Sequence, residues 1–451
     1  MTMKKQQTNV RDVAVETLLQ IERNQAYSNL LLNTMINKYK VNEKDIALLT
    51  ELVYGTLQRR ETLDYFLAGF LKKAKKIEAW VQILLRISIY QMIYLDRIPE
   101  RAVLFEAVEI AKKRGHKGIA SFVNGVLRSV QREGIPNLEE MKDPIEKLSI
   151  KTSHPLWLVK KWVKQFGYEE TEKMCEENLL PPSQTARVNQ TKTTVEGLLE
   201  ELQNKGIMIE YGDLSEDAIK GLKGNLALTD AFKEGKLTIQ DESSMLVARV
   251  LNPQPGEKVL DACAAPGGKS THIAERMKGT GIVHSLDLHE HKVKLIKQQA
   301  DRLQLQNIKA EALDSRKAGE RFEKESFDRI LVDAPCSGFG VIRRKPDIKY
   351  TKTGEDVNRL ASLQYSILQA VAPLLKRNGV LVYSTCTIDH EENSDVVKKF
   401  LDSHPEFERD QSITVNLPKK LHPYIENGEI QLLPHYFGSD GFYIACLRKK
   451  G

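Results

Sequence analysis

At 451 residues the chain is longer than one hydrophobic core usually supports, so we expect about three domains. Its 41% hydrophobic and 28% charged residues are typical of a globular protein, and no apolar run reaches the roughly 18 residues that cross a bilayer. The polar start predicts no signal peptide. Five cysteines without a C-x-x-C pair indicate neither a disulfide framework nor a zinc site and favour the cytosol.

The positive charge is concentrated in the first third of the chain. Residues 1–140 hold 22 Lys and Arg against 16 Asp and Glu, whereas the other 311 residues hold 45 of each. Two basic clusters stand out, at residues 72–76 and 112–117. Such clusters suit a phosphate backbone, although for each cluster alone a solvated helix end is the simpler interpretation.

Residues 1–140 are predicted to form an all-α domain. Apolar residues recur at helical spacing from Val10 onward, and the later segments 46–70, 81–95, 102–113 and 119–131 repeat the pattern. Short breaks with glycine, proline or lysine clusters separate them. The polar stretch 134–143, which contains Pro136, predicts a linker.

Residues 144–236 mix both kinds of element. We expect a helix from His154, a strand at 186–189, a helix at 195–205 and a strand at 225–228. This mixture predicts a small α+β domain. The aromatic spacing of an RNA-stacking sheet is absent from it.

Residues 237–451 alternate strands and helices. Strands are expected at 258–261, 281–287, 308–314, 328–333 and 379–384, with a helix over 356–376 between the last two. Repeated βα units predict a doubly wound, Rossmann-like parallel sheet. The segments 430–433 and 442–447 are candidates for antiparallel edge strands.

A glycine turn and three acidic residues predict a cofactor pocket. Gly267 and Gly268 follow the first strand, but neither the P-loop spacing nor the G-x-G-x-x-G fingerprint is present. Acidic residues close the next strands at Asp287, Asp314 and Asp333. Because no phosphate motif is found, an adenosine without phosphates, such as S-adenosylmethionine, is the expected ligand. A single acid of this kind is more often a helix cap.

Two cysteines lie at neighbouring predicted strand ends. Cys336 belongs to Asp333-Ala334-Pro335-Cys336-Ser337-Gly338, and Cys386 belongs to Ser384-Thr385-Cys386-Thr387. Ligands of open α/β sheets bind at the carboxyl ends of the strands. A single cysteine is often a small buried hydrophobe, but two beside an aspartate favour a cysteine-dependent site.

These motifs, with Cys263-Ala264-Ala265-Pro266-Gly267-Gly268-Lys269, resemble those of the RNA cytosine-C5 methyltransferases. The opening Arg11-Asp12-Val13-Ala14 and the segment 122–128 resemble the NusB-type RNA-binding domain, so the whole chain resembles the RsmB (Sun) family of 16S rRNA methyltransferases. The resemblance implies S-adenosylmethionine contacts at residues 263–269, Asp287, Asp314 and Asp333. It also implies that Cys386 attacks the base and Cys336 assists release; spacing alone does not rank the two thiols.

The implied chemistry explains the need for thiols. Carbon 5 of cytosine becomes nucleophilic once a thiolate has added at carbon 6, and Asp333 is placed to hydrogen-bond the base at N3. The cytosine must be single-stranded or flipped out, and Arg343-Arg344-Lys345 is expected near its phosphates. A metal at residues 287–291 is not expected, and the chain is expected to act as a monomer.

Three alternatives remain open. The first is a non-catalytic RNA-binding scaffold. The second is a methyltransferase that acts on an exocyclic amine, and the third is a cytosine-C5 methyltransferase that acts on another RNA, such as transfer RNA. The two thiols argue against the first. The Asp333-Ala334-Pro335-Cys336 turn stands where an amine methyltransferase has an aromatic residue, which argues against the second.

Overall fold

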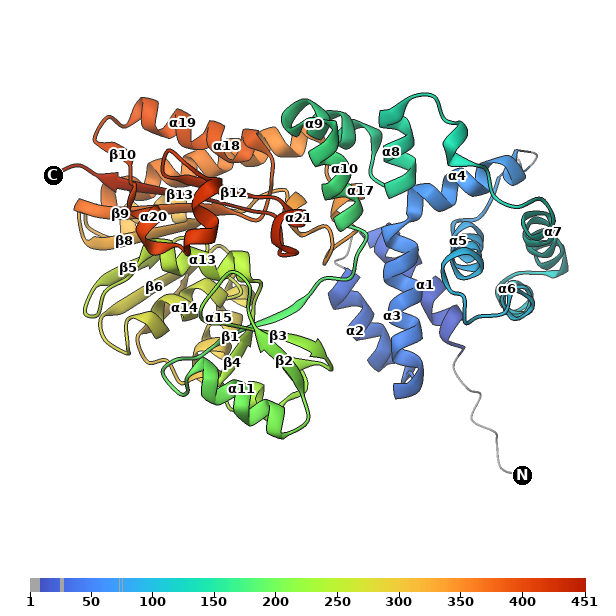
Figure 1. Cartoon of the computed structure of the whole chain (residues 1–451), viewed down its shortest axis with the longest axis horizontal. Coiled ribbons are helices and arrows are strands. Elements are labelled where there is room, and N and C mark those ends of the chain that lie inside the picture. The colour runs from blue at the N-terminus through green and yellow to red at the C-terminus, as the bar shows by residue number, and fades with distance from the viewer. Residues whose placement is uncertain (1–8, 25–27, 73, 75) are drawn as a thin grey trace. The chain divides into compact units, whose positions relative to one another are not determined.

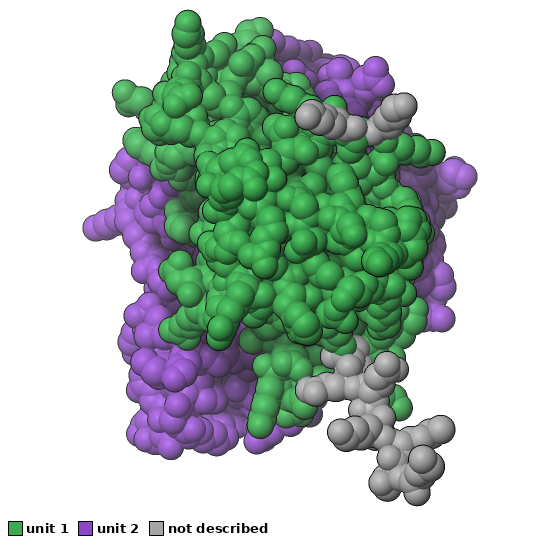
Figure 2. Space-filling view, turned by 90° about the vertical axis from the view of Figure 1, so that its right-hand side faces the viewer, with its two compact units in different colours: residues 1–180, 342–351 green, residues 181–341, 352–451 purple. Residues whose placement is uncertain are grey.

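The computed structural model describes residues 9–24, 28–72, 74 and 76–451, and Figure 1 shows its helices and strands. Two compact units are distinguished by colour in Figure 2. The first comprises residues 1–180 and 342–351, and the second comprises residues 181–341 and 352–451. No described helix combines the length and the apolar character that spanning a bilayer requires.

The N-terminal part of the first unit is helical, as predicted. Its apolar faces build one core that contains the fully buried Leu52, Leu85 and Leu127. The Arg59 position separates two helices where the sequence suggested one over 46–70. The helices are α1 (Val10–Asn24), α2 (Ser28–Tyr39), α3 (Glu43–Gln58), α4 (Arg60–Leu71), α5 (Ala79–Tyr94), α6 (Glu100–Arg114) and α7 (Lys117–Glu133).

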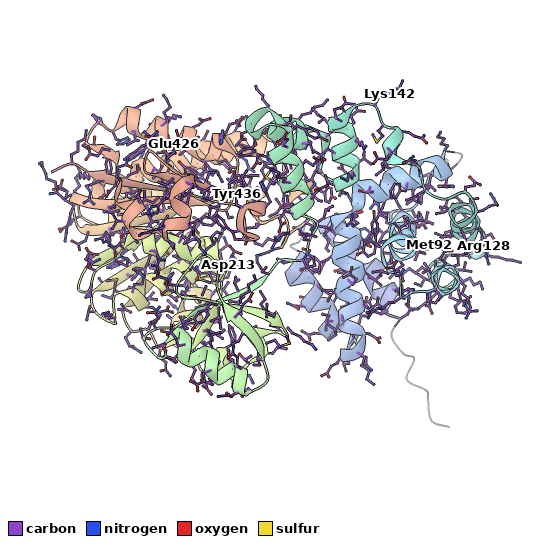
Figure 3. The ribbon with its side chains drawn as sticks, viewed as in Figure 1. Met92, Arg128, Lys142, Asp213, Glu426 and Tyr436 are labelled. Atoms are coloured by element: carbon purple, nitrogen blue, oxygen red, sulfur yellow. The ribbon has the colours of Figure 1, made fainter. Side chains whose placement is uncertain are left out.

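Part of the basic charge in this unit serves helix packing. Lys113 and Arg114, from the cluster 112–117, both pair with Asp12 of α1, so these two cations join α6 to α1. Arg128, labelled in Figure 3, instead projects from the exposed side of α7. In the cluster 72–76, Lys73 and Lys75 lie outside the described residues.

The segment 342–351 belongs to the first unit, as do α8 (Pro144–Thr152), α9 (Leu156–Phe166) and α10 (Tyr168–Glu177). It contains the short α17 (Ile348–Thr351). The Lys349 side-chain nitrogen donates to the carbonyl oxygen of Gln58 at 2.8 Å, and Arg343 is buried against Glu177. The expectation that Arg343 contacts RNA phosphates is therefore wrong, because its guanidinium is used inside the protein.

The second unit begins with a small α+β fold, as predicted. A four-stranded antiparallel sheet has the order β2-β3-β1-β4. Ala186 on β1 and Ile219 on β3 are fully buried against Leu198 and Leu202 of the covering helix. The elements are β1 (Gln184–Val188), α11 (Val195–Asn204), β2 (Met208–Tyr211), β3 (Ala218–Lys223), α12 (Asp230–Lys233) and β4 (Leu237–Ile239).

Two expected boundaries are wrong. The stretch 225–228 is a 3-10 turn, not a strand, because the Asn225 side chain accepts a hydrogen bond from the Ala227 amide and favours a turn. The helix expected over 356–376 is α18 (Gly354–Val371), and Pro373 stands in the turn that ends it. Strand β9 (Leu375–Thr385) then starts four residues earlier than predicted.

The remaining strands form one nine-stranded mixed sheet, in the order β11-β12-β13-β9-β8-β5-β6-β7, with β10 paired to β13. The five strands from β9 to β7 are parallel, which confirms the Rossmann-like expectation, and β12 and β13 are the expected antiparallel edge strands. The strands are β5 (Lys258–Asp261), β6 (Ile282–Asp287), β7 (Ile308–Ala312), β8 (Phe327–Asp333), β10 (Phe407–Arg409), β11 (Ile425–Glu426), β12 (Glu429–Leu432) and β13 (Phe442–Lys449).

Helices cover both faces of this sheet (Figure 1). Successive strand residues alternate between two apolar cores: Val259 and Leu331 face one core, and Leu260 and Ile330 face the other. This double burial explains why the strands read as continuous apolar runs. The first core is covered by α13 (Glu242–Leu251), α14 (Gly268–Arg276) and α15 (Glu290–Leu303), and the second by α18 and α19 (Ser394–Ser403).

Candidate active site

The two predicted cysteines lie side by side. Strands β8 and β9 are parallel neighbours in the register Asp333 to Ser384, so the loops that follow them leave the same edge of the sheet. The Cys336 and Cys386 sulfur atoms are 3.4 Å apart, within reach of an S–H···S hydrogen bond. Both side chains are half-buried. The structure therefore brings together the two thiols that the sequence placed at neighbouring strand ends.

Main-chain hydrogen bonds tie the two cysteine loops to each other. The Ala334 amide donates to the Ser384 carbonyl at 2.9 Å, and the Gly340 amide donates to the Cys386 carbonyl at 3.0 Å. A Cβ atom at Gly340 would lie 1.9 Å from the Gly441 carbonyl oxygen, so this close approach requires glycine. The loops are thus held as one rigid pair.

Asp333 is held between two side chains. The Lys269 ammonium donates to one of its oxygens at 2.8 Å, and the Ser384 hydroxyl donates to the other at 2.8 Å. Burial lowers the pKa of Lys269, but the charges of Asp333 and then of Cys386 outweigh it, so this pKa is raised overall. Lys269 therefore remains a cation beside Asp333 and Cys386.

The glycine turn connects β5 to α14. Gly267 has a φ of 108°, and a Cβ atom there would come within 3.1 Å of the Ile296 Cα, so the turn packs closely on α15. The Ala264 amide donates to the Leu286 carbonyl at 2.8 Å, which fixes the turn against β6. The turn comprises the predicted cofactor residues Cys263, Ala264, Ala265, Pro266, Gly267, Gly268 and Lys269.

The predicted acidic residues converge on this turn. Burial raises the pKa of the Cys263 thiol well above its usual value, and the negative charges of four carboxylates raise it further. These carboxylates belong to Asp261, Asp333, Asp287 and Asp314. A thiol in this setting stays protonated, which fits a packing role for Cys263.

The four carboxylates are not equally available to a ligand. Asp261 is fully buried and accepts from the Ser270 hydroxyl at 2.6 Å; burial raises its pKa to about 7. Asp314 accepts hydrogen bonds from both the guanidinium and the backbone amide of Arg316, which lower its pKa. Asp287, at the end of β6, accepts a 3.0 Å hydrogen bond from the His289 amide. Its half-buried side chain lies at the carboxyl end of β6, the position where Rossmann-like sheets commonly carry a ribose-binding acid.

Glu392 is a site residue that the sequence reasoning missed. It is fully buried six residues after Cys386, and it accepts a 2.9 Å hydrogen bond from the amide of Ser337, the neighbour of Cys336. Burial raises the pKa of Glu392 to about 7. The acidic run 389–392 directly after the second cysteine motif was the available signal.

A cavity of about 610 Å³ lies elsewhere in the second unit. It is lined by residues from the loops that precede β6 and β7, at the opposite edge of the sheet from the cysteines. Its acids, Asp217 and Glu275, are already paired with cations of the protein. Both acids of this cavity are therefore already used within the protein, and the candidate site is placed at the cysteine edge.

Comparison with known proteins gives three family matches along the chain. A model of the NusB family matches residues 8–132, and a model of the ferredoxin-like domain of RsmF/B-like methyltransferases matches residues 154–227. A model described as 16S rRNA methyltransferase RsmB/F matches residues 248–448. These matches agree with the helical, α+β and Rossmann-like expectations; the exact domain boundaries 1–140, 144–236 and 237–451 stay predictions.

Relatives match over nearly the whole length. The chain is 60% identical over 444 residues to the probable ribosomal RNA small subunit methyltransferase B of Bacillus subtilis, covering 98% of this chain and 99% of that protein. It is 36% identical over 452 residues to ribosomal RNA small subunit methyltransferase B of Pseudomonas putida, covering 98% of each. The crystal structure of PH0851 aligns over 99% of this chain and 100% of that one, with a TM-score of 0.83 and 27% identity.

Proposed function

Since the chain belongs to the RsmB/F family of 16S rRNA methyltransferases, we propose that it methylates carbon 5 of a cytosine in 16S ribosomal RNA through a covalent enzyme–RNA adduct. The methyl donor is S-adenosylmethionine. The observation that carries the proposal is the 3.4 Å approach of the Cys336 and Cys386 sulfur atoms beside Asp333. A scaffold without catalysis has no use for such a pair.

The charges around the thiols support different roles for them. Cys386 interacts with the Lys269 cation, which favours a thiolate and therefore a nucleophile. Cys336 has its pKa raised well above the usual value by its hydrogen bond with Cys386, by burial, and by the charges of Cys386, Glu392 and Asp333. We therefore assign the attack on the base to Cys386 and the assistance of its release to Cys336.

The addition step then follows from the placement of Asp333. The Cys386 thiolate adds at carbon 6 of the cytosine while N3 takes up a proton from water, which it gives back when the product is released, and the Asp333 carboxylate accepts a hydrogen bond from this N3–H group. Lys269 and Ser384 fix both oxygens of Asp333, so this carboxylate is oriented before the base arrives. Carbon 5 of the adduct is then an enamine carbon that accepts an electrophilic methyl group.

The cofactor pocket is assigned to the glycine turn and the acidic strand ends. S-adenosylmethionine supplies an electrophilic methyl group on a sulfonium. The close-packed turn at residues 263–269 lets a ligand approach the backbone, and Asp287 offers a carboxylate for ribose hydroxyls. We further propose that Asp314 and Asp333 line the same pocket. Asp314 follows β7 at the edge of the sheet where the strands end, and Asp333 is bonded to Lys269 of the glycine turn.

The target must be unpaired, because a stacked base does not expose carbon 6 to a thiolate. The exposed cations of the helical unit, such as Arg128, are proposed to hold the surrounding phosphates. A monomeric, cytosolic enzyme remains our prediction.

The test uses the purified Cys336→Ala variant with 16S RNA and S-adenosylmethionine. A protein–RNA adduct is expected on a denaturing gel, because release is slowed while attack is intact. The adduct is expected to vanish in the Cys336→Ala/Cys386→Ala double variant and to be absent with transfer RNA. An adduct formed only with transfer RNA would show that transfer RNA, and not 16S RNA, is the substrate. The absence of both adduct and methyl transfer with either RNA would refute the proposal.

A further inference from the structure

Glu392 holds the backbone on both sides of Cys336. Its Oε2 atom accepts from the Ser337 amide at 2.9 Å and from the Gln364 side-chain amide at 3.0 Å. The same Gln364 nitrogen donates to the Pro335 carbonyl at 3.0 Å. The turn that carries Cys336 is thus clamped at both of its neighbours by one buried carboxylate and one buried amide.

The second oxygen of the Glu392 carboxylate makes no hydrogen bond within the described part of the chain. Among the described residues, Glu392 Oε1 is buried and has no hydrogen-bond partner. A buried carboxylate with an unsatisfied oxygen destabilises the fold relative to a satisfied group, so a glutamate here calls for an explanation. A glutamine would clamp Ser337 equally well without a charge, which suggests that the charge itself is what the site uses.

The charges around the thiol pair are asymmetric. The charges of Cys386, Glu392 and Asp333 raise the pKa of Cys336, and the cation Lys269 interacts with Cys386. Asp389 adds a further negative charge beside Glu392, and the Tyr383 hydroxyl, on β9, donates to the Glu392 carbonyl at 2.6 Å. The charge of Glu392 therefore acts on Cys336, whereas the Lys269 cation, which is paired with Asp333, acts on Cys386.

We propose that Glu392 is a positioning residue that keeps the single proton of the thiol pair on Cys336, so that Cys386 is the thiolate and Cys336 donates the hydrogen bond between them. This inference deepens the proposed function and rests on it for the identity of the substrate. Its support is the clamp at residues 335 and 337 together with the asymmetric charges. Burial raises the pKa of Glu392 to about 7, so the carboxylate carries its charge above neutral pH.

The proton on Cys336 has a defined task in the release step. The C5–H bond of the methylated adduct breaks, its proton passes to water, and its electron pair forms the C5–C6 double bond. The bond from carbon 6 to sulfur breaks with its electron pair leaving on Cys386. The S–H of Cys336 donates a hydrogen bond to this departing thiolate and lowers the barrier, which restores the starting pair.

The experiment measures the alkylation of Cys336 by iodoacetamide as a function of pH, in the Cys386→Ala background, with mass spectrometry of the peptide that contains Cys336. In the background variant the midpoint is expected above the usual thiol value of about 8.5. Adding Glu392→Gln is expected to lower the midpoint by about one pH unit or more, and Glu392→Asp is expected to stay close to the background. A midpoint that does not fall in Glu392→Gln overturns the inference.

A purely structural role of Glu392 gives a different result. Because Glu392→Gln keeps the clamp on Ser337, a purely structural role predicts an unchanged alkylation midpoint and an unchanged melting temperature in this variant. If Glu392→Gln fails to fold, the Cys386→Ala variant still tests the inference. An alkylation midpoint of Cys336 below about 8.5 in that variant refutes the placement of the proton on Cys336.

The assay needs no RNA, so it is independent of the proposed function. If the alkylation midpoint of Cys336 shifts but the wild type transfers no methyl group to 16S RNA, the placement of the proton is supported and the proposed substrate is refuted. In the protein with both cysteines, Glu392→Gln is also expected to accumulate the RNA adduct that the wild type releases. Methyl transfer with normal release in this variant would show that Glu392 does not govern the release step.

Discussion

Lys269, near the start of α14, donates a 2.8 Å hydrogen bond to Asp333, at the end of β8, and so joins the glycine turn to the cysteine loops. The ammonium also lies 5.1 Å from the centre of the Phe442 ring, which supports its position through a cation–π contact. One side chain thus links the residues assigned to the cofactor with those assigned to the base.

Replacing Lys269 by Met is expected to slow single-turnover methyl transfer about 10- to 100-fold, because a hydrogen bond to a charged group contributes about 1.5–3 kcal/mol. Asp333 loses its orientation and Cys386 loses the cation that favours its thiolate. Lys269→Arg keeps the charge and is expected to retain more activity. Equal rates in the Met variant and the wild type would show that the pair has no part in catalysis.

Asp287→Ala is expected to weaken S-adenosylmethionine binding about tenfold or more, measured by calorimetry, because two ribose hydroxyls lose their acceptor. RNA affinity is expected to be unchanged. Asp301→Ala, an exposed acid at the end of α15 in the same unit, serves as the matched control. A similar loss in both variants would indicate a general effect of charge and would contradict a ribose contact.

Gly340→Ala is expected to abolish methyl transfer, since the new methyl group would collide with the Gly441 and Cys386 carbonyl oxygens and separate the cysteine loops. Gly319→Ala is the control, because nothing lies within 4 Å of its added methyl group. A glycine to alanine change within a helix stabilises it by about 0.5–1 kcal/mol. An active Gly340→Ala variant would mean that the loops tolerate rearrangement.

The burial of Lys349 leads us to expect that the stability of the first unit depends on pH. Burial lowers the pKa of this lysine to about 7, far below its usual value of about 10.4. Between these two values the unfolded chain binds more protons, so stability rises with pH from about 7 upward, by at most about 1.4 kcal/mol per unit. Above pH 8.5 the buried Cys175 thiol, whose pKa is raised to about 12 by burial, opposes this rise.

The measurement is urea unfolding between pH 6.5 and 8.5, followed by tryptophan fluorescence, because Trp80, Trp157 and Trp162 all lie in the first unit. The wild type is expected to gain stability over this window relative to Lys349→Met. Lys44→Met, which removes an exposed lysine, is expected to follow the wild type. Parallel curves for the wild type and Lys349→Met would contradict a neutral buried amine.

Much of the active-site edge could be predicted from local sequence. Apolar runs followed by turn residues located β8 and β9, and parallel strands end at one edge of a sheet, so Cys336 and Cys386 had to be near neighbours. The same argument predicted that Asp287 and Asp333, which end β6 and β8, lie at this edge of the sheet. The errors at 225–228 and at the end of α18 came from apolar residues whose local capping and proline chemistry outweighed their periodicity.

The sequence by itself determined the order of the elements, the residue types at each strand end and the kind of chemistry they allow, because these follow from local periodicity and short motifs. Only the tertiary structure decided which charges face which thiol. Arg343 forms a buried ion pair with Glu177, Lys269 donates a hydrogen bond to Asp333, and Glu392 accepts one from Ser337 beside Cys336. Burial and pairing over long sequence separations set the protonation of a group, and no local pattern records them.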